Sequence, residues 1–169
     1  MPRLLQINST ANWGSTGRIA EQIGSRAKEH GWQSYIAYGR CSNPSGSHLI
    51  KIGGKVGMGY HLLMSRLLDR HGLESRLATR DLIKQIDSIK PDVVHLHNIH
   101  GYYLNYPLLF DYLNNANIPI VWTLHDCWAL TGHCSHFVTA ECYKWQSGCH
   151  DCPLKRAYPK SWWDGSSRN

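Results

Sequence analysis

Short apolar runs alternate with helical patterns along the first 125 residues, and this alternation constrains the fold more than any other feature of the sequence. The apolar runs predict buried strands at residues 4–7, 32–38, 92–97 and 120–124, whereas residues 41–54 are expected to be loop-like apart from a short apolar run at 49–52. Strands that alternate with helices in this way are typical of a parallel sheet. The sequence therefore predicts an α/β domain in which helices cover both faces of one parallel sheet.

The helical patterns lie between the predicted strands, over about 18–30, 56–68, 79–90 and 107–114. In the first pattern Ile19, Ile23 and Ala27 recur at a spacing of four and are expected to form its apolar face. Thr79 is expected to cap the third helix, and Pro107 suits the first turn of the fourth. From residue 127 onward no periodic pattern continues, so an irregular segment is expected there.

Length, charge and cysteine content restrict the class of protein. A chain of 169 residues can form one domain with a core, but it is too short for two ordinary domains. Its start is far less apolar than a signal peptide or membrane span, so a cytoplasmic location with reduced thiols is expected. The net charge of +6 is scattered, and no nucleic-acid partner is expected.

Polar segments follow the predicted strands at 4–7, 92–97 and 120–124, at the edge where an open parallel sheet binds ligands. The first segment contains glycines that let a backbone approach a phosphate, and the helix after it would add partial positive charge. Neither G-x-G-x-x-G nor a lysine-bearing P-loop is present, and a tight turn with Ser15 or Thr16 as N-cap is the alternative. The candidate phosphate-binding residues are Asn8, Gly14, Ser15, Thr16, Gly17 and Arg18.

The second segment, residues 95–101, is rich in histidine. In a strand His95 and His97 share one face and can chelate a metal together. The alternative is one histidine in the core and one at the edge, and it is the preferred interpretation because a metal would also need ligands from other strands.

The third segment is His125-Asp126, directly after the last predicted strand. An imidazole at a strand end can act as base, acid or hydrogen-bond donor, so His125 is a candidate catalytic residue. Asp126 is either its catalytic neighbour or the cap of the following turn, because adjacent residues in a strand point to opposite faces.

A cysteine block follows this segment, with Cys134, Cys142, Cys149 and Cys152 separated by seven, six and two residues. Four thiolates match a structural zinc site, and Cys149-His150-Asp151-Cys152 resembles one half of a zinc knuckle. Free thiols and disulfides are the alternatives. Zinc would supply the folding free energy that a segment without an apolar stripe lacks.

Three segments, "KPDVVHLHNIHGYYLN", "VWTLHDCWALTGHC" and "CYKWQSGCHDCP", resemble the N-terminal half of bacterial family 4 glycosyltransferases. The likeness is greatest to enzymes that build colanic acid and other surface polysaccharides. It implies one half of a GT-B fold, in which two Rossmann-like domains face each other. It also implies metal-independent, retaining transfer of a sugar, of the hexosyltransferase type, from a nucleotide-sugar donor to a saccharide or lipid-linked acceptor.

The resemblance also implies roles for the three polar segments. The loop from Asn8 to Arg18 would lie near the donor diphosphate and the acceptor, and His125 would contact the donor sugar near the reacting carbon. The residues that would line the acceptor side are His97, Asn98, His100, Gly101 and Tyr102.

The second Rossmann-like domain of the family is not expected in a chain of this length. The predicted organisation is a Rossmann-like domain at 1–126, a cysteine-rich, zinc-binding insertion at 127–155, and the start of a connection to the missing C-terminal domain at 156–169. Such a fragment is expected to be inactive alone, because the groups that stabilise the departing diphosphate would be absent.

Three other interpretations stay open. His95, His97, His125 and Asp126 can be the zinc site of a hydrolase. The cysteine block can instead be a non-enzymatic zinc-binding interaction module. Exposed Trp162 and Trp163 can make a peripheral contact at the inner face of the membrane, or they can pack against the missing domain.

Overall fold

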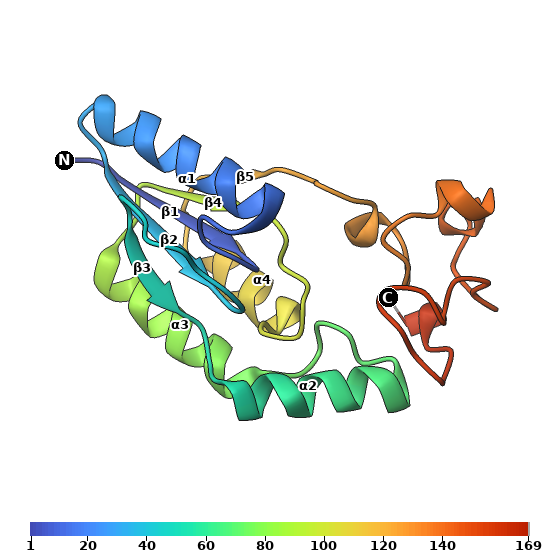
Figure 1. Cartoon of the computed structure of the whole chain (residues 1–169). Helices are drawn as coiled ribbons and strands as arrows, with labels where there is room; N and C mark the ends of the chain where they lie inside the picture. The colour runs from blue at the N-terminus through green and yellow to red at the C-terminus, as the bar shows by residue number, and fades with distance from the viewer. Residues whose placement is uncertain (169) are drawn as a thin grey trace.

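The protein, described here from a computed structural model that covers residues 1–168, contains one five-stranded parallel sheet (Figure 1). The strand order is β3-β2-β1-β4-β5, so β1 lies in the centre. The strands are β1 (Arg3–Asn8), β2 (Gln33–Tyr38), β3 (His48–Lys51), β4 (Val93–Leu96) and β5 (Ile120–Trp122). The predicted parallel α/β sheet is confirmed.

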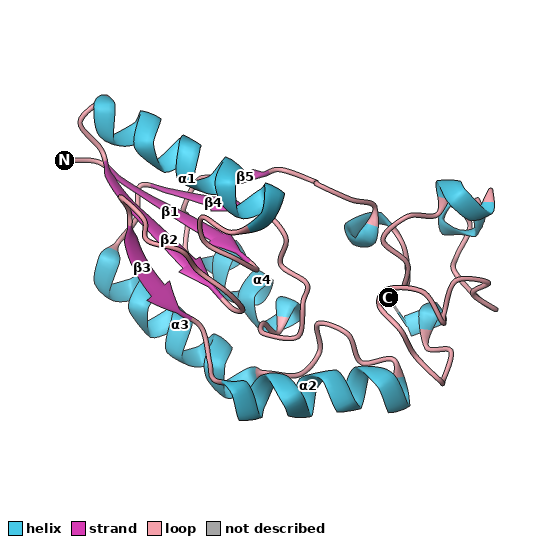
Figure 2. Cartoon of the chain, viewed as in Figure 1, coloured by secondary structure: helices cyan, strands magenta, loops and turns pink. Residues whose placement is uncertain are grey.

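Helices cover both faces of the sheet (Figure 2). Helix α1 (Gly14–Glu29) lies on one face, and α3 (Arg76–Ile89) and α4 (Tyr106–Asn115) lie on the other. Helix α2 (Lys55–Leu68) follows β3 and extends past the carboxyl end of the sheet. All four helices were predicted within a few residues of their observed bounds.

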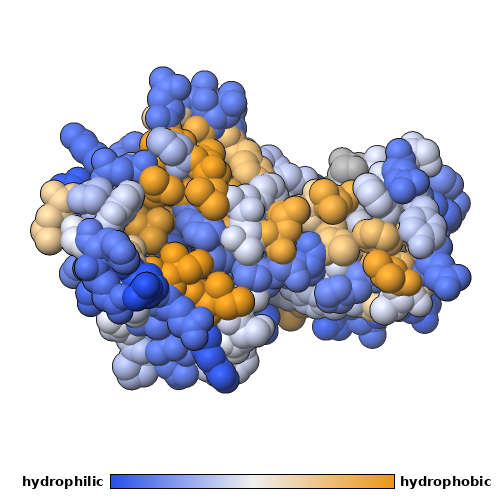
Figure 3. All heavy atoms as spheres, turned by 90° about the horizontal axis from the view of Figure 1, so that it is seen from above, coloured by the Kyte–Doolittle hydropathy of each residue, from blue (hydrophilic) through white to orange (hydrophobic). Residues whose placement is uncertain are grey.

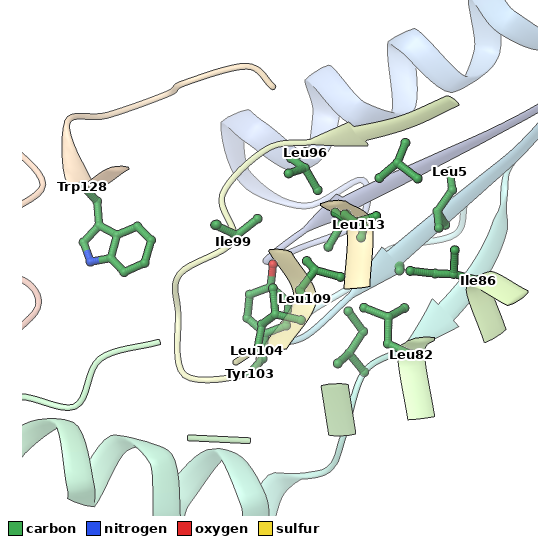
Figure 4. Close-up of a cluster of buried hydrophobic side chains, with 14 residues drawn as sticks. Leu5, Leu82, Ile86, Leu96, Ile99, Tyr103, Leu104, Leu109, Leu113 and Trp128 are labelled. Atoms are coloured by element: carbon green, nitrogen blue, oxygen red, sulfur yellow. The ribbon is translucent and has the colours of Figure 1, made fainter. Parts of the chain in front are cut away.

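The main hydrophobic core lies between the sheet and the pair α3 and α4 (Figure 4). Leu5 and Ile7 of β1 point into it, because alternate residues of a strand face opposite sides of the sheet. Gln6 and Asn8, the polar residues of the same strand, are fully buried on the α1 side. The central strand therefore places two polar side chains where they must find partners inside the protein.

The buried face of α1 differs from the prediction. Its buried residues are Gly17, Ala20 and Gly24, whereas Ile19 is 38% exposed and Ile23 is only half-buried. These small residues let α1 approach the sheet closely: a Cβ atom at Gly17 would lie 2.7 Å from Thr10 Oγ1. Figure 3 views the molecule from the α1 side and shows apolar surface between hydrophilic residues.

The start of α3 also differs from the prediction, because Thr79 lies inside the helix and Ser75 is the N-cap. The Thr79 hydroxyl donates to Ser75 O at 3.0 Å and accepts the Asn105 N–H at 2.8 Å. Asn105 in turn caps α4 by accepting the Leu108 N–H at 3.0 Å. Thr79 therefore connects the starts of two helices instead of capping one.

After β5, residues 123–168 form no α-helix and no strand, only short 3-10 turns at Trp128–Leu130, Val138–Ala140, Lys144–Gln146 and Ser166–Arg168. Trp128, 8% exposed, anchors this segment by joining the main core. Its ring lies 5.5 Å from the ring of His71 and 5.6 Å from that of Tyr106.

A second anchor is Asp69, the buried residue that ends α2. Its carboxylate accepts hydrogen bonds from His133 Nδ1 at 2.7 Å and from the Gly165 N–H at 2.9 Å. The backbone N–H of Trp162 donates a further hydrogen bond to Arg66 O at 2.8 Å. Part of the segment predicted to start a connection at 156–169 thus packs on α2, and Asn169 lies outside the described residues.

Across residues 1–168, no helix combines the length and the apolar character that crossing a membrane requires.

Two buried histidines near these anchors make the stability depend on pH. His61 bonds Ser75 Oγ at 2.8 Å and accepts the Gly72 N–H at 3.0 Å, and burial lowers its pKa to about 4. Burial, followed by the nearby His100, His61 and His133, holds the pKa of His71 well below its usual value. Both rings are therefore neutral in the folded protein near neutral pH.

We expect the free energy of unfolding to fall as the pH is lowered from about 7 to about 5. The unfolded chain protonates its histidines near pH 6.5, whereas His61 and His71 stay neutral in the folded state, so stability present above that pH is lost below it. Each such histidine contributes a slope approaching about 1.4 kcal/mol per pH unit. Urea denaturation across this pH range measures the effect.

The matched control is a histidine on the surface. His61→Gln should make the free energy of unfolding depend less steeply on pH, and it should do so more than the same substitution at exposed His30. Equal denaturation midpoints at both ends of the pH range would contradict this prediction.

Candidate active site

The three predicted polar segments meet at the carboxyl edge of the sheet and are joined by hydrogen bonds. Asn8 Oδ1 accepts the Asn98 N–H at 3.3 Å, which links the end of β1 to the end of β4. His97 Nδ1 and His125 Nε2 share a hydrogen bond of 3.0 Å, which links the residue after β4 to the residues after β5. The structure therefore places Asn8, His97 and His125 at one edge, as the parallel topology requires.

The loop after β1 ends in a helix N-terminus without a side-chain cap. Helix α1 begins at Gly14, and its N-cap Trp13 makes no capping hydrogen bond. Ser15 and Thr16 lie within the first turn, so the alternative in which one of them caps the helix is wrong. No acidic side chain occupies this turn, and its free N–H groups favour an anion.

The shape of the loop depends on Asn8 and on two positive φ angles. Asn8 Nδ2 donates to Thr10 O at 2.9 Å and to Thr16 Oγ1 at 3.3 Å. Asn12 has a φ of 47° and Gly14 a φ of 67°, which turns the chain sharply into α1. Arg18 is exposed in the first two turns of the helix.

The histidines form a stacked chain on the α1 side of the sheet. The rings of His95 and His97 are stacked at 4.2 Å, and those of His97 and His125 at 5.3 Å. His95 Nε2 bonds Thr123 Oγ1 at 2.8 Å, and His97 Nε2 bonds Gln6 Oε1 at 3.1 Å. His125 is half-buried and is the most exposed of these three stacked histidines.

Burial keeps these rings neutral. It lowers the pKa of His97 to about 3, with smaller contributions from His95 and His125. Burial also lowers the pKa of His95 and of His125, although Asp126 opposes the shift at His125. A neutral imidazole at the edge can accept a proton or a hydrogen bond from a ligand.

Asp126 faces a different partner. Its carboxylate bonds His100 Nε2 at 2.7 Å and accepts the Trp128 N–H at 3.0 Å, so it caps the turn that carries Trp128. Burial raises the pKa of this carboxyl, but the hydrogen bonds from His100 and Trp128 outweigh burial and lower it overall. The structure therefore gives Asp126 the capping position that the sequence left as the alternative.

His97 and His125 hydrogen-bond each other, but His95 bonds Thr123 and Asp126 bonds His100. No group of three or more His, Cys, Asp or Glu side chains within residues 1–168 is arranged to hold a metal ion. The histidine arrangement thus offers no zinc centre of the kind the hydrolase interpretation requires.

The remaining residues predicted for the acceptor side lie beneath the irregular segment. His100 Nδ1 bonds Tyr158 Oη at 3.0 Å, and the Gly101 N–H donates to His71 Nε2 at 3.4 Å. Tyr102 has a φ of 70°, a strained value for a tyrosine, and its ring lies 4.8 Å from that of His71. Within this group, His97, Asn98 and His100 take part in hydrogen bonds that join segments following different strands.

The four cysteines of the predicted zinc site surround one small cavity of about 10 Å³. All six cysteines are free, and none of the four belongs to a group arranged as metal ligands among the described residues. Burial raises the pKa of Cys134, and it raises that of Cys152 to about 11, so these thiols are protonated and poorly nucleophilic at neutral pH. The predicted zinc site is therefore not supported by the positions of its ligands.

Two residues that support the site, Gln6 and Thr123, were not predicted from the sequence. Gln6 interrupts the apolar run of β1, and a polar residue inside a buried strand was the signal that could have drawn attention to it. Thr123 carries no comparable signal, because a threonine is ordinary at a strand end.

A cavity of about 620 Å³ does not mark the site. It lies between α3 and α4 and is lined by residues such as Lys90, Pro91 and Ile118, which precede β4 and β5. The cavity at the carboxyl edge measures only about 10 Å³ and is lined by residues that include His97, His100, His125 and Asp126. We assign the site by its polar groups and its place in the topology.

Comparisons with known proteins identify the family of the chain. The sequence profile of Glycosyltransferase Family 4 matches residues 16–163. The chain is 28% identical over 169 residues to WcaC of Escherichia coli (strain K12), which is named as a colanic acid biosynthesis glycosyl transferase. That alignment covers 92% of this chain, and the chain spans 40% of the length of WcaC.

One solved structure, that of TcCGT1 in complex with UDP, has a similar fold. It matches with a TM-score of 0.52 and 15% identity, over 90% of this chain and 34% of its own. The resemblance seen in the sequence motifs is confirmed, because the family profile covers most of the chain. The chain belongs to glycosyltransferase family 4.

Proposed function

We propose that the chain is the N-terminal, acceptor-binding half of a retaining glycosyltransferase of the GT-B type. The complete enzyme would transfer a hexosyl group from a nucleotide-sugar donor to a saccharide or lipid-linked acceptor in polysaccharide biosynthesis. The observation that carries the proposal is the hydrogen-bonded meeting of Asn8, Asn98, His97 and His125 at the carboxyl edge. The name of WcaC and the UDP in the TcCGT1 structure support the acceptor and donor classes.

The loop after β1 is proposed to face the donor diphosphate. The first turn of α1 offers N–H groups without a side-chain cap, and it contains Ser15, Thr16 and the buried Gly17. Arg18 is exposed beside this turn and adds a positive charge. A helix N-terminus with a nearby cation stabilises an anionic group without any metal.

His125 is proposed to contact the donor sugar. Its ring is neutral at neutral pH, so it can accept a hydrogen bond from a sugar hydroxyl and then stabilise positive charge that develops near the reacting carbon. Asp126 is proposed to act indirectly, by capping the turn that follows His125 and so holding His125 in position.

A cytoplasmic location and a peripheral membrane contact are part of the proposal, because a lipid-linked acceptor lies in a membrane. Trp162 and Trp163 are 63% and 58% exposed, and Lys155, Arg156 and Lys160 precede them in the sequence. Exposed indoles beside cations are typical of contacts with an anionic lipid surface.

The purified 169-residue chain should not transfer sugar by itself. In the GT-B architecture that the resemblance implies, the groups that stabilise the departing diphosphate belong to the second domain. Release of nucleoside diphosphate from a panel of nucleotide sugars, with and without saccharide acceptors, measures this. Turnover by the chain alone would refute the half-enzyme proposal.

In the complete protein, His125→Ala should lower kcat by roughly 100-fold, the usual effect of removing one electrostatic contact to a transition state. The assay is again release of nucleoside diphosphate. The control is His30→Ala, an exposed residue at the end of α1, which should leave kcat unchanged. Equal rates for His125→Ala and the unmodified protein would remove His125 from the site.

We also propose that Cys134, Cys142, Cys149 and Cys152 hold a structural zinc. What supports this is that all four surround one cavity in a segment without α-helix or strand. The Gly132 N–H also donates to Cys149 Sγ at 3.2 Å, as backbone amides do to metal-bound thiolates. Since the thiols are not arranged as ligands in the structure, zinc would have to draw them together.

Metal analysis of the purified chain tests the zinc proposal. We expect one zinc per chain, lost when Cys149 and Cys152 are both replaced by serine and retained in the control Cys41→Ser, which changes an exposed cysteine outside the cavity. A chain that is folded and zinc-free after expression in zinc-containing medium would overturn the proposal.

A further inference from the structure

Gln6 is a fully buried polar residue in the centre of the sheet, and helix α1 fixes its orientation. Gln6 Nε2 donates to the carbonyl oxygen of Ala20 at 2.8 Å. A carbonyl oxygen can only accept, so the amide nitrogen must face α1, and Gln6 Oε1 must face His97.

The fixed amide determines which nitrogen of His97 carries the hydrogen. Gln6 Oε1 lies 3.1 Å from His97 Nε2 and can only accept, so the hydrogen is on Nε2. The low pKa of His97, about 3 and caused chiefly by burial, leaves the ring with a single N–H at neutral pH. Nδ1 of His97 therefore carries a lone pair.

The same reasoning extends to His125. Its Nε2 lies 3.0 Å from the lone pair of His97 Nδ1, so Nε2 of His125 must donate. Burial also keeps His125 neutral, which leaves a lone pair on its Nδ1. Within residues 1–168 no hydrogen bond involves this Nδ1 atom.

We propose that Gln6, acting through His97, is a positioning residue that holds His125 in the tautomer with hydrogen on Nε2 and a lone pair on Nδ1. The inference rests on the proposed function, since the ligand of Nδ1 would be a sugar hydroxyl that donates its hydrogen to this nitrogen. The opposite tautomer would present an N–H to the same hydroxyl and reverse the direction of the hydrogen bond.

Nitrogen-15 NMR of the histidine rings in the 169-residue chain tests this arrangement without any substrate. Nitrogens with and without a hydrogen resonate in separate regions, so each tautomer is read directly. We expect His97 and His125 both to carry hydrogen on Nε2 at neutral pH. Hydrogen on Nδ1 of His125 would overturn the proposal, whether or not the chain belongs to a sugar-transferring enzyme.

Gln6→Leu should release this constraint, because leucine cannot accept the hydrogen bond from His97. His97 and His125 should then populate both tautomers. The control Gln22→Leu changes an exposed glutamine of α1 and should leave the spectrum unchanged. A folded Gln6→Leu chain with unchanged tautomers would overturn the proposal, and if this variant fails to fold, the spectrum of the unmodified chain still decides.

Kinetics of the complete protein show whether Gln6 acts through His97. Gln6→Leu should lower kcat about 10- to 100-fold, as loss of an outer partner of a catalytic group does. In a His97→Phe background the same change should have no further effect, whereas additive losses would contradict the proposed connection. A rise in KM for the donor alone or the acceptor alone identifies which hydroxyl Nδ1 accepts. If the histidines have the expected tautomers but the complete protein transfers no sugar, only the proposed function is refuted.

Discussion

The buried polar side chains of the central strand are the constraint on which the edge of the sheet depends. Gln6 and Asn8 have no access to solvent, and a buried polar group without a partner would cost about 1–3 kcal/mol. Gln6 finds its partners in α1 and in His97, the residue after β4, and Asn8 finds its own in the loop after β1 and in Asn98. Satisfying these two side chains therefore also places the loop, the helix and the neighbouring strand.

The sequence predicted four of the five strands and all four helices from their apolar patterns, but β3 was expected to be loop, and β5 is an exposed edge strand although its apolar run predicted burial. The prediction also failed where packing depends on small residues. The apolar Ile19 and Ile23 suggested the buried face of α1, but Gly17, Ala20 and Gly24 occupy it, since only small side chains allow the helix to approach the sheet. The sequence pattern predicts Thr79 as a cap because it does not show that the Thr79 hydroxyl accepts a hydrogen bond at the start of the next helix.

The candidate site was predictable in its location but only partly in its contacts. Parallel strands bring their carboxyl ends to one edge, so the meeting of Asn8, His97 and His125 follows from topology. Topology does not determine the direction in which a side chain points at a strand end. Asp126 turns to His100 and the Trp128 turn, a choice that depends on the irregular segment, which has no periodic pattern.

Asp69 serves two parts of the irregular segment at once, since His133 and the Gly165 N–H bind the same carboxylate. If either part detaches from α2, the buried Asp69 carboxylate becomes exposed while the other part is still hydrogen-bonded to it. The region that packs on α2 should consequently open as one cooperative unit, and its amides should exchange hydrogen with a common opening free energy.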